Sequence, residues 1–151
     1  MNVMACAGCN MHETEQDKIN ELNVMQRLSG IWHCTYEKLP EYYLADFYCE
    51  RDSKVAWVEV RCRTNAKSFY PSVYIDIMKA KKLVEVAELT STRIFFVVQW
   101  ADECGFMELH RGALMGQPIS YPKRNKPRSD KQKEVPVFEL PIAEFKTLWS
   151  D

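Results

Sequence analysis

The sequence lacks the motifs on which several large enzyme classes depend. Its 151 residues include only five glycines and three histidines. No glycine-rich phosphate loop, nucleophile elbow or dinucleotide fingerprint occurs in it. Because the histidines are widely separated, nucleophilic catalysis of the Ser-His or Cys-His kind has little support. These absences direct attention to chemistry carried by carboxylates and basic side chains.

The sequence also lacks long apolar runs. No run approaches the length of a membrane span, and the first residues do not show the basic-then-apolar order of a signal peptide. Six cysteines without a secretion signal before them favour reduced thiols over a disulfide framework. We therefore expect a soluble, cytoplasmic protein with no membrane partner.

A large excess of one charge is absent as well, since the net charge is -1. If the protein binds nucleic acid, its positive field must therefore be local. A hydrophobic content of 46% is enough to bury a core, and 151 residues suit one domain. We expect an irregular lead over residues 1–12 and a single domain over residues 13–151.

Hydrophobic periodicity predicts an α/β fold with a central mixed sheet flanked by helices. Thr14 and Asp17 resemble a capping box, so a first helix is expected from there to about Ser29, with Gly30 as its left-handed stop. Its apolar stripe is expected at Ile19, Leu22 and Met25. Strands are expected over residues 31–38, 44–49, 55–63, 94–100, 106–110 and 135–140. Further helices are expected over residues 73–89 and from Pro141, the last carrying Ile142, Phe145 and Leu148.

Two carboxylates stand out on adjacent strands of this pattern. Side chains alternate between the faces of a strand, so Trp57, Glu59, Arg61 and Arg63 share one face and the apolar residues between them share the other. A short polar turn over residues 50–54 is suited to a hairpin, which would bring Asp46 next to Glu59.

Two nearby carboxylates repel each other unless a cation lies between them. Mg²⁺ or Mn²⁺ would fit, because these hard cations take carboxylate oxygens and retain waters. The alternative is that Asp46 and Glu59 lie on a solvated sheet face and form ordinary ion pairs with Arg61 and Arg63.

The order helix, strand, Asp on a second strand, Glu-x-basic on a third, then helix and strand resembles the PD-(D/E)XK nuclease superfamily. The likeness is greatest to small phage-type members and Holliday junction resolvases, and it runs from the first helix to about Trp100. It implies a restriction-endonuclease-like core in the order α-β-β-β-α-β. Asp46 matches the first acid and Glu59 the second, while Ala45 replaces the proline.

Arg61 stands where this superfamily has its catalytic lysine. Arginine carries a fixed charge and cannot act as a tunable proton donor or acceptor. Similar phage nucleases carry a lysine on the following helix, which implies this role for Lys79. The alternative is that Lys79, at the border of that helix's stripe and in line with Leu83, extends its amine into solvent.

Members of the superfamily often add a glutamate from the first helix to the metal site. Glu21 is the nearest match, with Glu15 as a rival. Either residue could equally lie on a solvated helix face.

A basic segment is predicted near the end of the chain. Between Gly116 and Glu134 there are six basic and two acidic residues, a local balance of +4, interrupted by three prolines. It could track a phosphate backbone, with Tyr121 stacking on a base, or simply be a solvated insertion. The candidate DNA-binding residues are Arg63, Lys123, Arg124, Lys126 and Arg128.

Cys6, Cys9 and His12 are close together in the sequence and are types that bind zinc. No second pair at the usual spacing completes a site, so a metal-free lead is favoured over a zinc site.

The resemblance thus implies a Mg²⁺- or Mn²⁺-dependent nuclease, phage-encoded and acting on branched or replicating DNA in the host cytoplasm. In that mechanism Asp46, Glu59, Lys79 and Arg61 are catalytic, and Asp46, Glu59 and Glu21 hold the metal. A homodimer would suit a substrate with two strands. The alternative is a catalytically degenerate member that binds nucleic acid or a host protein without cleaving it.

Overall fold

The computed structural model describes residues 14–122 and 135–151. It begins with helix α1 (Glu15–Trp32), which packs beside strand β3 (Lys54–Cys62). Thr14 caps α1 by accepting a hydrogen bond from the N–H of Asp17, whose carboxylate accepts one from the N–H of Thr14. The predicted capping box is therefore present.

A six-stranded mixed sheet forms the centre of the fold, in the order β1-β2-β3-β5-β6-β9. Apart from β3, its strands are β1 (Thr35–Lys38), β2 (Phe47–Arg51), β5 (Arg93–Gln99), β6 (Glu103–Glu108) and β9 (Lys146–Ser150). Strands β3 and β5 are parallel and the other neighbours are antiparallel. The α/β class and the central mixed sheet are as predicted.

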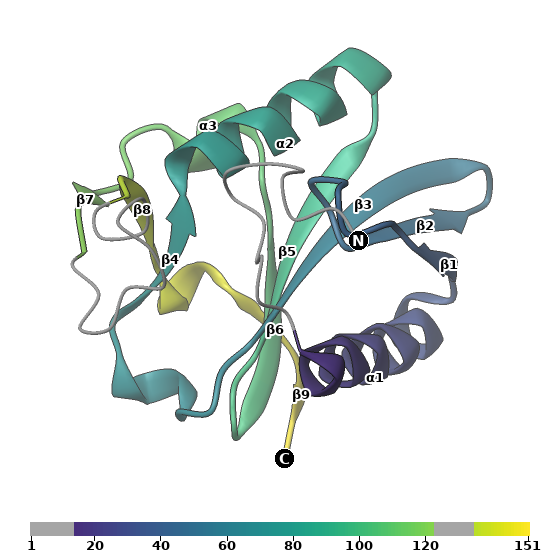
Figure 1. Ribbon diagram of the computed structural model, residues 1–151, viewed down its shortest axis with the longest axis horizontal. Helices are drawn as coiled ribbons and strands as arrows, with labels where there is room; N and C mark the ends of the chain where they lie inside the picture. Colours follow the sequence, from purple (N-terminus) through teal and green to yellow (C-terminus); the bar gives the residue numbers. More distant parts are fainter. Residues whose placement is uncertain (1–13, 123–134) are drawn as a thin grey trace.

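Two helices cover opposite faces of this sheet (Figure 1). One core cluster joins α1 to the face that carries Phe47, Val58 and Val60. The other joins α2 (Ile77–Thr90) to the face that carries Ile94 and Phe96. Side chains of β3 therefore alternate between two cores, as the sequence pattern predicted.

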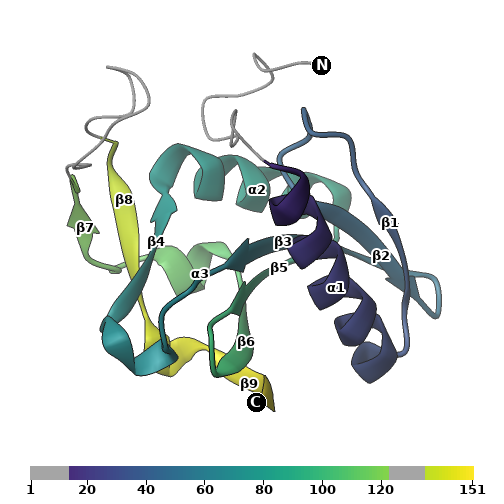
Figure 2. The ribbon, with the colours of Figure 1, turned by 60° about the horizontal axis from the view of Figure 1, so that its bottom comes forward.

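A second, three-stranded sheet stands beside the first, in the order β4-β8-β7 (Figure 2). Its strands are β4 (Ser72–Asp76), β7 (Ile119–Ser120) and β8 (Val137–Pro141). The short elements between strands are η1 (Lys67–Phe69), α3 (Arg111–Leu114) and η3 (Ile142–Glu144).

The predicted helix over residues 73–89 was wrong at its start. Val73 and Ile75 belong to β4, where alternation buries both side chains, and the helix begins after Asp76. The Asp76 carboxylate accepts hydrogen bonds from the N–H groups of Met78 and Lys79, which fixes the boundary. A run with apolar residues two and four apart satisfies both a strand and a helix pattern, so periodicity alone did not separate them.

The end of α1 was also misplaced. The helix continues through Gly30 to Trp32, and His33 takes the left-handed conformation, with φ 53°. Trp32 packs against the rings of Phe95 and Phe106, which favours the extra turn. Val24, Met25 and Leu28 are the buried residues of α1, whereas Ile19 and Leu22 are 49% and 44% exposed. The first strand accordingly starts at Thr35, not Ile31.

Two further expectations were wrong near the C-terminus. The strand predicted at 106–110 is β6 and begins at Glu103. The predicted helix after Pro141 is only the single turn η3, and Leu148 lies in β9. Pairing of β9 with β6 supplies backbone hydrogen bonds that an isolated short helix could not match.

Candidate active site

The β2–β3 hairpin brings the two predicted carboxylates together. Its turn residues Asp52 and Ser53 both have positive φ, as a two-residue hairpin turn requires. Phe47 pairs with Val58 at the end of the β2–β3 ladder. Asp46, the residue before Phe47, lies close enough to Glu59 for its carboxylate to raise the pKa of Glu59, and both residues line one cleft. The N–H of Asp46 donates to the Val58 carbonyl, and its Oδ2 accepts a 2.8 Å hydrogen bond from the N–H of Val60. This hydrogen bond holds the Asp46 carboxylate beside Val60 of β3.

Glu59 is only 3% exposed, although it is ionisable. Burial, and then the nearby Asp46 carboxylate, raise the pKa of Glu59 to about 7, against the opposing effects of Lys79 and Arg61. Its Oε1 atom is buried and accepts no hydrogen bond from the described residues. Glu59 is therefore not on a solvated sheet face, and one of its oxygens is left for another partner.

Lys79 reaches the same point from the first turn of α2. Its Nζ lies 2.6 Å from Oε2 of Glu59, and the residue is 8% exposed. The alternative that Lys79 extends its amine into solvent was therefore wrong. Because β4 ends at Asp76, the first turn of α2 lies above the sheet face that carries Glu59.

Arg61 is hydrogen-bonded to β4, and its charge is close enough to oppose the rise in the pKa of Glu59. Its Nη1 donates a 2.7 Å hydrogen bond to the Tyr74 carbonyl, and its guanidinium lies 5.3 Å from the centre of the Phe96 ring. Arg63 follows β3 and is exposed, with its N–H bonded to the Gln99 carbonyl. Both arginines line the same cleft as Asp46 and Glu59.

Lys38, which the sequence analysis missed, lies between two acidic side chains. Its Nζ is 3.5 Å from Glu21 and 3.7 Å from Asp46. Lys38 pairs with Phe47 at the end of β1, and that register next to Asp46 is the signal that could have identified it. Glu15, the rival to Glu21, is 88% exposed in its side chain and pairs with Lys18 outside the cleft.

A cleft of about 220 Å³ is lined by the acidic and basic residues described above, among them Lys38, Asp46, Glu59, Arg61 and Lys79. In the described ranges, no three or more His, Cys, Asp or Glu side chains gather closely enough to hold a metal ion. Asp46 and Glu59 nevertheless supply two neighbouring carboxylates to this cleft, and one buried Glu59 oxygen has no hydrogen bond to the described residues. A Mg²⁺ ion is commonly held by one or two carboxylates plus substrate phosphate, so this donor pair fits such an ion.

Several predicted sites fall outside the described residues. These are the basic residues Lys123, Arg124, Lys126 and Arg128, and the Cys6, Cys9 and His12 group. Tyr121, at the edge of the described part, is 64% exposed. No helix within residues 14–122 or 135–151 is long and apolar enough to cross a membrane.

The sequence and structure were compared with known proteins. Residues 9–148 match the model of a family described as phage putative PDDEXK endonuclease. Comparison with curated protein sequences gives no match. Among solved structures, the Holliday junction resolvase Hjc from Archaeoglobus fulgidus is similar at 13% identity and a TM-score of 0.49, over 83% of this chain and 97% of that one. The nuclease D212 from a fusellovirus is similar at 16% identity and a TM-score of 0.45, over 89% of this chain and 84% of that one.

Proposed function

Since this chain belongs to the phage PDDEXK endonuclease family, we propose that it is a divalent-metal-dependent nuclease that hydrolyses DNA phosphodiesters. The observation that supports the proposal best is the buried Glu59. It lies near the Asp46 carboxylate, contacts Lys79 through one oxygen and has no hydrogen bond to described residues at the other.

Asp46 and Glu59 would hold the metal. A bound Mg²⁺ or Mn²⁺ would lower the pKa of a water and offset charge on the attacked phosphate. The hydrogen bond from the N–H of Val60 orients Asp46 before the ion arrives, which lowers the cost of assembling the site. Glu21 would contribute a third carboxylate if the amine of Lys38 turned from it toward a substrate phosphate.

Lys79 would perform the role of the superfamily's catalytic lysine, whose position on β3 is occupied by Arg61 in this chain. Its amine is already at Glu59, so it could steady the attacking water or the charged phosphate oxygens. Arg61 is anchored to β4 at one nitrogen, and its charge would attract the phosphate from the wall of the cleft. Arg63, exposed at the end of β3, would contact an adjacent phosphate.

We place the activity on branched or replicating DNA in the host cytoplasm. The family's phage description and the sequence resemblance to Holliday junction resolvases support this proposal. A homodimer would allow two strands to be cut, and the basic segment from 116 to 134 would add phosphate contacts.

The purified protein should cleave branched, single-stranded or duplex DNA when Mg²⁺ or Mn²⁺ is added and should stop when the metal is chelated. Calorimetric titration should show saturable Mn²⁺ binding. Glu59→Gln and Asp46→Asn should each weaken that binding by about tenfold or more and abolish cleavage, because each removes one of few anionic ligands. Wild-type metal affinity in both variants would rule these carboxylates out as ligands.

The second candidate is a binding protein that has lost catalysis, and Arg61 is the observation that favours it. That function predicts DNA binding without cleavage at any metal concentration. Cleavage that appears only in the Arg61→Lys variant would support it, whereas cleavage by the wild type would exclude it.

A further inference from the structure

A second cleft lies directly beside the candidate active site. It has a volume of about 450 Å³, within the range of small-molecule pockets, and its lining is mainly apolar. Tyr43, Leu44 and Ala45, from the segment between β1 and β2, line both clefts. That segment is therefore a shared wall, and a ligand bound in one cleft can extend over it into the other.

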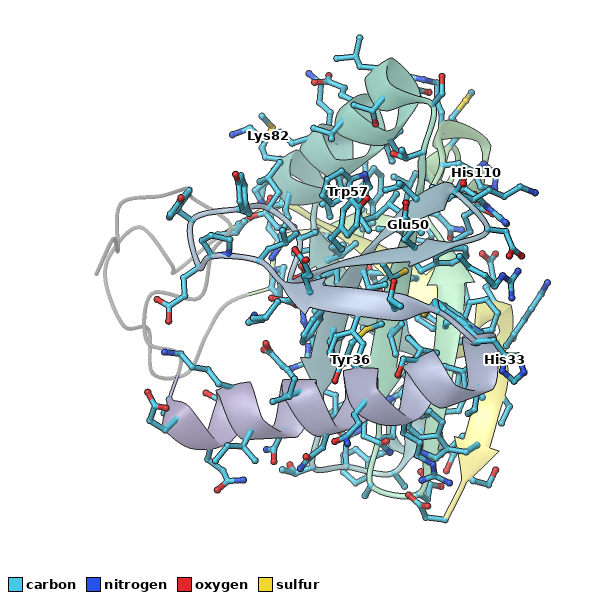
Figure 3. All side chains as sticks on the ribbon, turned by 90° about the vertical axis from the view of Figure 1, so that its right-hand side faces the viewer. His33, Tyr36, Glu50, Trp57, Lys82 and His110 are labelled. Atoms are coloured by element: carbon cyan, nitrogen blue, oxygen red, sulfur yellow. The ribbon has the colours of Figure 1, made fainter. Side chains whose placement is uncertain are left out.

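Four aromatic residues are among those that line this second cleft. Tyr42 and Tyr43 are 50% and 51% exposed, and their ring centres are 5.1 Å apart. Tyr48 and Trp57, which also line the cleft, meet edge to face with their ring centres 5.4 Å apart. Figure 3 shows Trp57 between α2 and the β2–β3 hairpin.

The rings are held in place by contacts outside the cleft. The Trp57 indole N–H donates a 2.8 Å hydrogen bond to Thr92 Oγ1. Glu41, next to Tyr42, forms a 2.6 Å ion pair with Lys18 of α1, which ties down the segment that carries both exposed tyrosines. Ordered aromatic rings with half-exposed faces bind planar ligands at a low entropic cost.

We propose that this cleft is a base-binding subsite that receives one unpaired nucleotide next to the scissile phosphate. The inference rests on the proposed nuclease function, which puts a DNA phosphate at Asp46 and Glu59. The adjoining nucleotide must then lie at the shared wall. Its base would stack on Tyr42 or Tyr43, and stacking on aromatic rings is tolerant of sequence.

A substrate class follows from this arrangement. A base within a duplex is stacked and paired, so it cannot enter a side cleft unless it is extruded. The subsite therefore selects DNA with an unpaired nucleotide at the cleaved position, such as a flap, a gap or the arm of a branch. Among the described residues that line the cleft, Glu37 is the one that carries a charge, and its repulsion of phosphate favours entry of the base, not the backbone.

The test measures binding without cleavage. Fluorescence anisotropy in the presence of a chelator compares a labelled thymidine oligonucleotide with the same backbone carrying abasic units. The Tyr42→Leu/Tyr43→Leu double variant should bind the thymidine oligonucleotide about tenfold or more weakly than the wild type, because the rings on which the base stacks are lost. Its affinity for the abasic oligonucleotide should be unchanged, because that oligonucleotide has no base to stack. Phe69→Leu/Tyr70→Leu is the matched control, since Phe69 and Tyr70 are also adjacent and exposed, with ring centres 4.8 Å apart, and they line neither cleft.

Equal loss on both oligonucleotides, or no loss, would overturn the inference. A wild-type dimer that becomes monomeric in the tyrosine variant, with unchanged binding, would mean that a second copy fills the cleft. Photo-crosslinking of wild-type protein to an iodouracil oligonucleotide is independent of any variant's folding. It should label Tyr42 or Tyr43, and labelling only elsewhere would also overturn the inference. Failure of the wild type to cleave DNA would instead contradict the proposed function while leaving this binding result intact.

Discussion

Glu59 combines burial, a raised pKa and an ion pair. This arrangement reduces the stability of the folded protein, which indicates that Glu59 has a function. A buried ion pair recovers only part of the desolvation cost of its two charges. Here one oxygen of Glu59 also has no hydrogen bond to described residues, which adds to that cost. Groups with strongly shifted pKa values concentrate at functional sites, which agrees with the proposed role of Glu59 as a metal ligand.

The stability of the metal-free protein should depend on the protonation of Glu59. Its folded-state pKa is about 7, above the ordinary value of 4.5, so the folded state binds the proton more tightly than the unfolded state. The resulting stabilisation is complete below about pH 4.5 and is lost as the pH rises through about 7. Urea unfolding from pH 5 to pH 7.5 should therefore show a falling free energy of unfolding in the wild type relative to Glu59→Gln. Parallel pH profiles for the two proteins would mean that Glu59 does not titrate in this range.

Lys79 should matter for turnover more than for DNA binding. We expect Lys79→Ala and Lys79→Met to lower the single-turnover rate by ~100-fold or more, the scale of losing a positioned charge or proton donor, with nearly unchanged DNA affinity. Lys81→Ala is the control, because Lys81 lies on the same helix and pairs with Glu85 at the surface. Arg61→Lys should remain active, whereas Arg61→Ala should weaken substrate binding.

Wild-type turnover in both Lys79 variants would remove this residue from the mechanism. Their folding is checked independently, since an unpaired Glu59 charge could destabilise the protein by about 3–5 kcal/mol. A Glu59→Gln/Lys79→Met variant removes both charges and should recover much of that loss in urea unfolding without recovering cleavage.

At the scale of elements, helix α1 shows how a local sequence signal can be overridden. Glycine near a helix end usually marks the left-handed stop, yet Gly30 is helical and His33 takes that position. A methyl group added at Gly30 would meet no atom of the described residues within 4 Å. Gly105, in β6 beside the β6–β9 bulge, has the Lys146 carbonyl oxygen 3.0 Å from where its Cβ would be.

These two glycines should respond oppositely to alanine. Gly30→Ala should raise the free energy of unfolding by about 0.5–1 kcal/mol, because alanine loses less backbone entropy in a helix. Gly105→Ala should lower it by about 1–3 kcal/mol, because the neighbouring backbone must shift. The midpoint of urea unfolding measures both changes. Destabilisation by Gly30→Ala would mean that α1 ends earlier.

The sequence predicted the hairpin but not the second sheet, for a physical reason. Alternation along β3 and the short polar turn determine the placing of Asp46 and Glu59, since both depend on neighbours in the sequence. The pairing of β4 with β8 joins segments far apart in the chain, and no local pattern encodes it. Lys38 lies beside Asp46 through the pairing of β1 with β2, a register that was not worked out from the sequence, so Lys38 was missed. The contact of Lys79 with Glu59 depends on how α2 packs on the sheet, so the sequence indicated Lys79 only through the family resemblance.

At the scale of the whole molecule, the charge distribution raises a problem for DNA binding. The net charge is -1, and the candidate active site contributes Asp17, Glu21, Glu41, Asp46 and Glu59 to one cleft. Lysines and arginines in the same cleft offset these charges without producing a large positive field. Attraction of a phosphate backbone therefore needs another source, and the segment from Gly116 to Glu134, with its balance of +4, is the candidate in the sequence.

Replacing Lys123, Arg124, Lys126 and Arg128 with alanine should lower DNA affinity and flatten its dependence on salt. Each lost phosphate contact reduces the slope of log affinity against log salt by roughly 0.7–0.9, so four contacts correspond to about three units. The matched control replaces Lys81 and Lys82, two exposed lysines of α2 outside the cleft, and should leave the slope nearly unchanged. Binding titrations from 50 to 300 mM salt measure the slope, with uncleaved DNA kept intact by a chelator. An unchanged slope in the four-residue variant would mean that the segment is a solvated insertion. Arg61 and Arg63 would then be the phosphate contacts to test next, because they line the cleft through which the DNA backbone must pass.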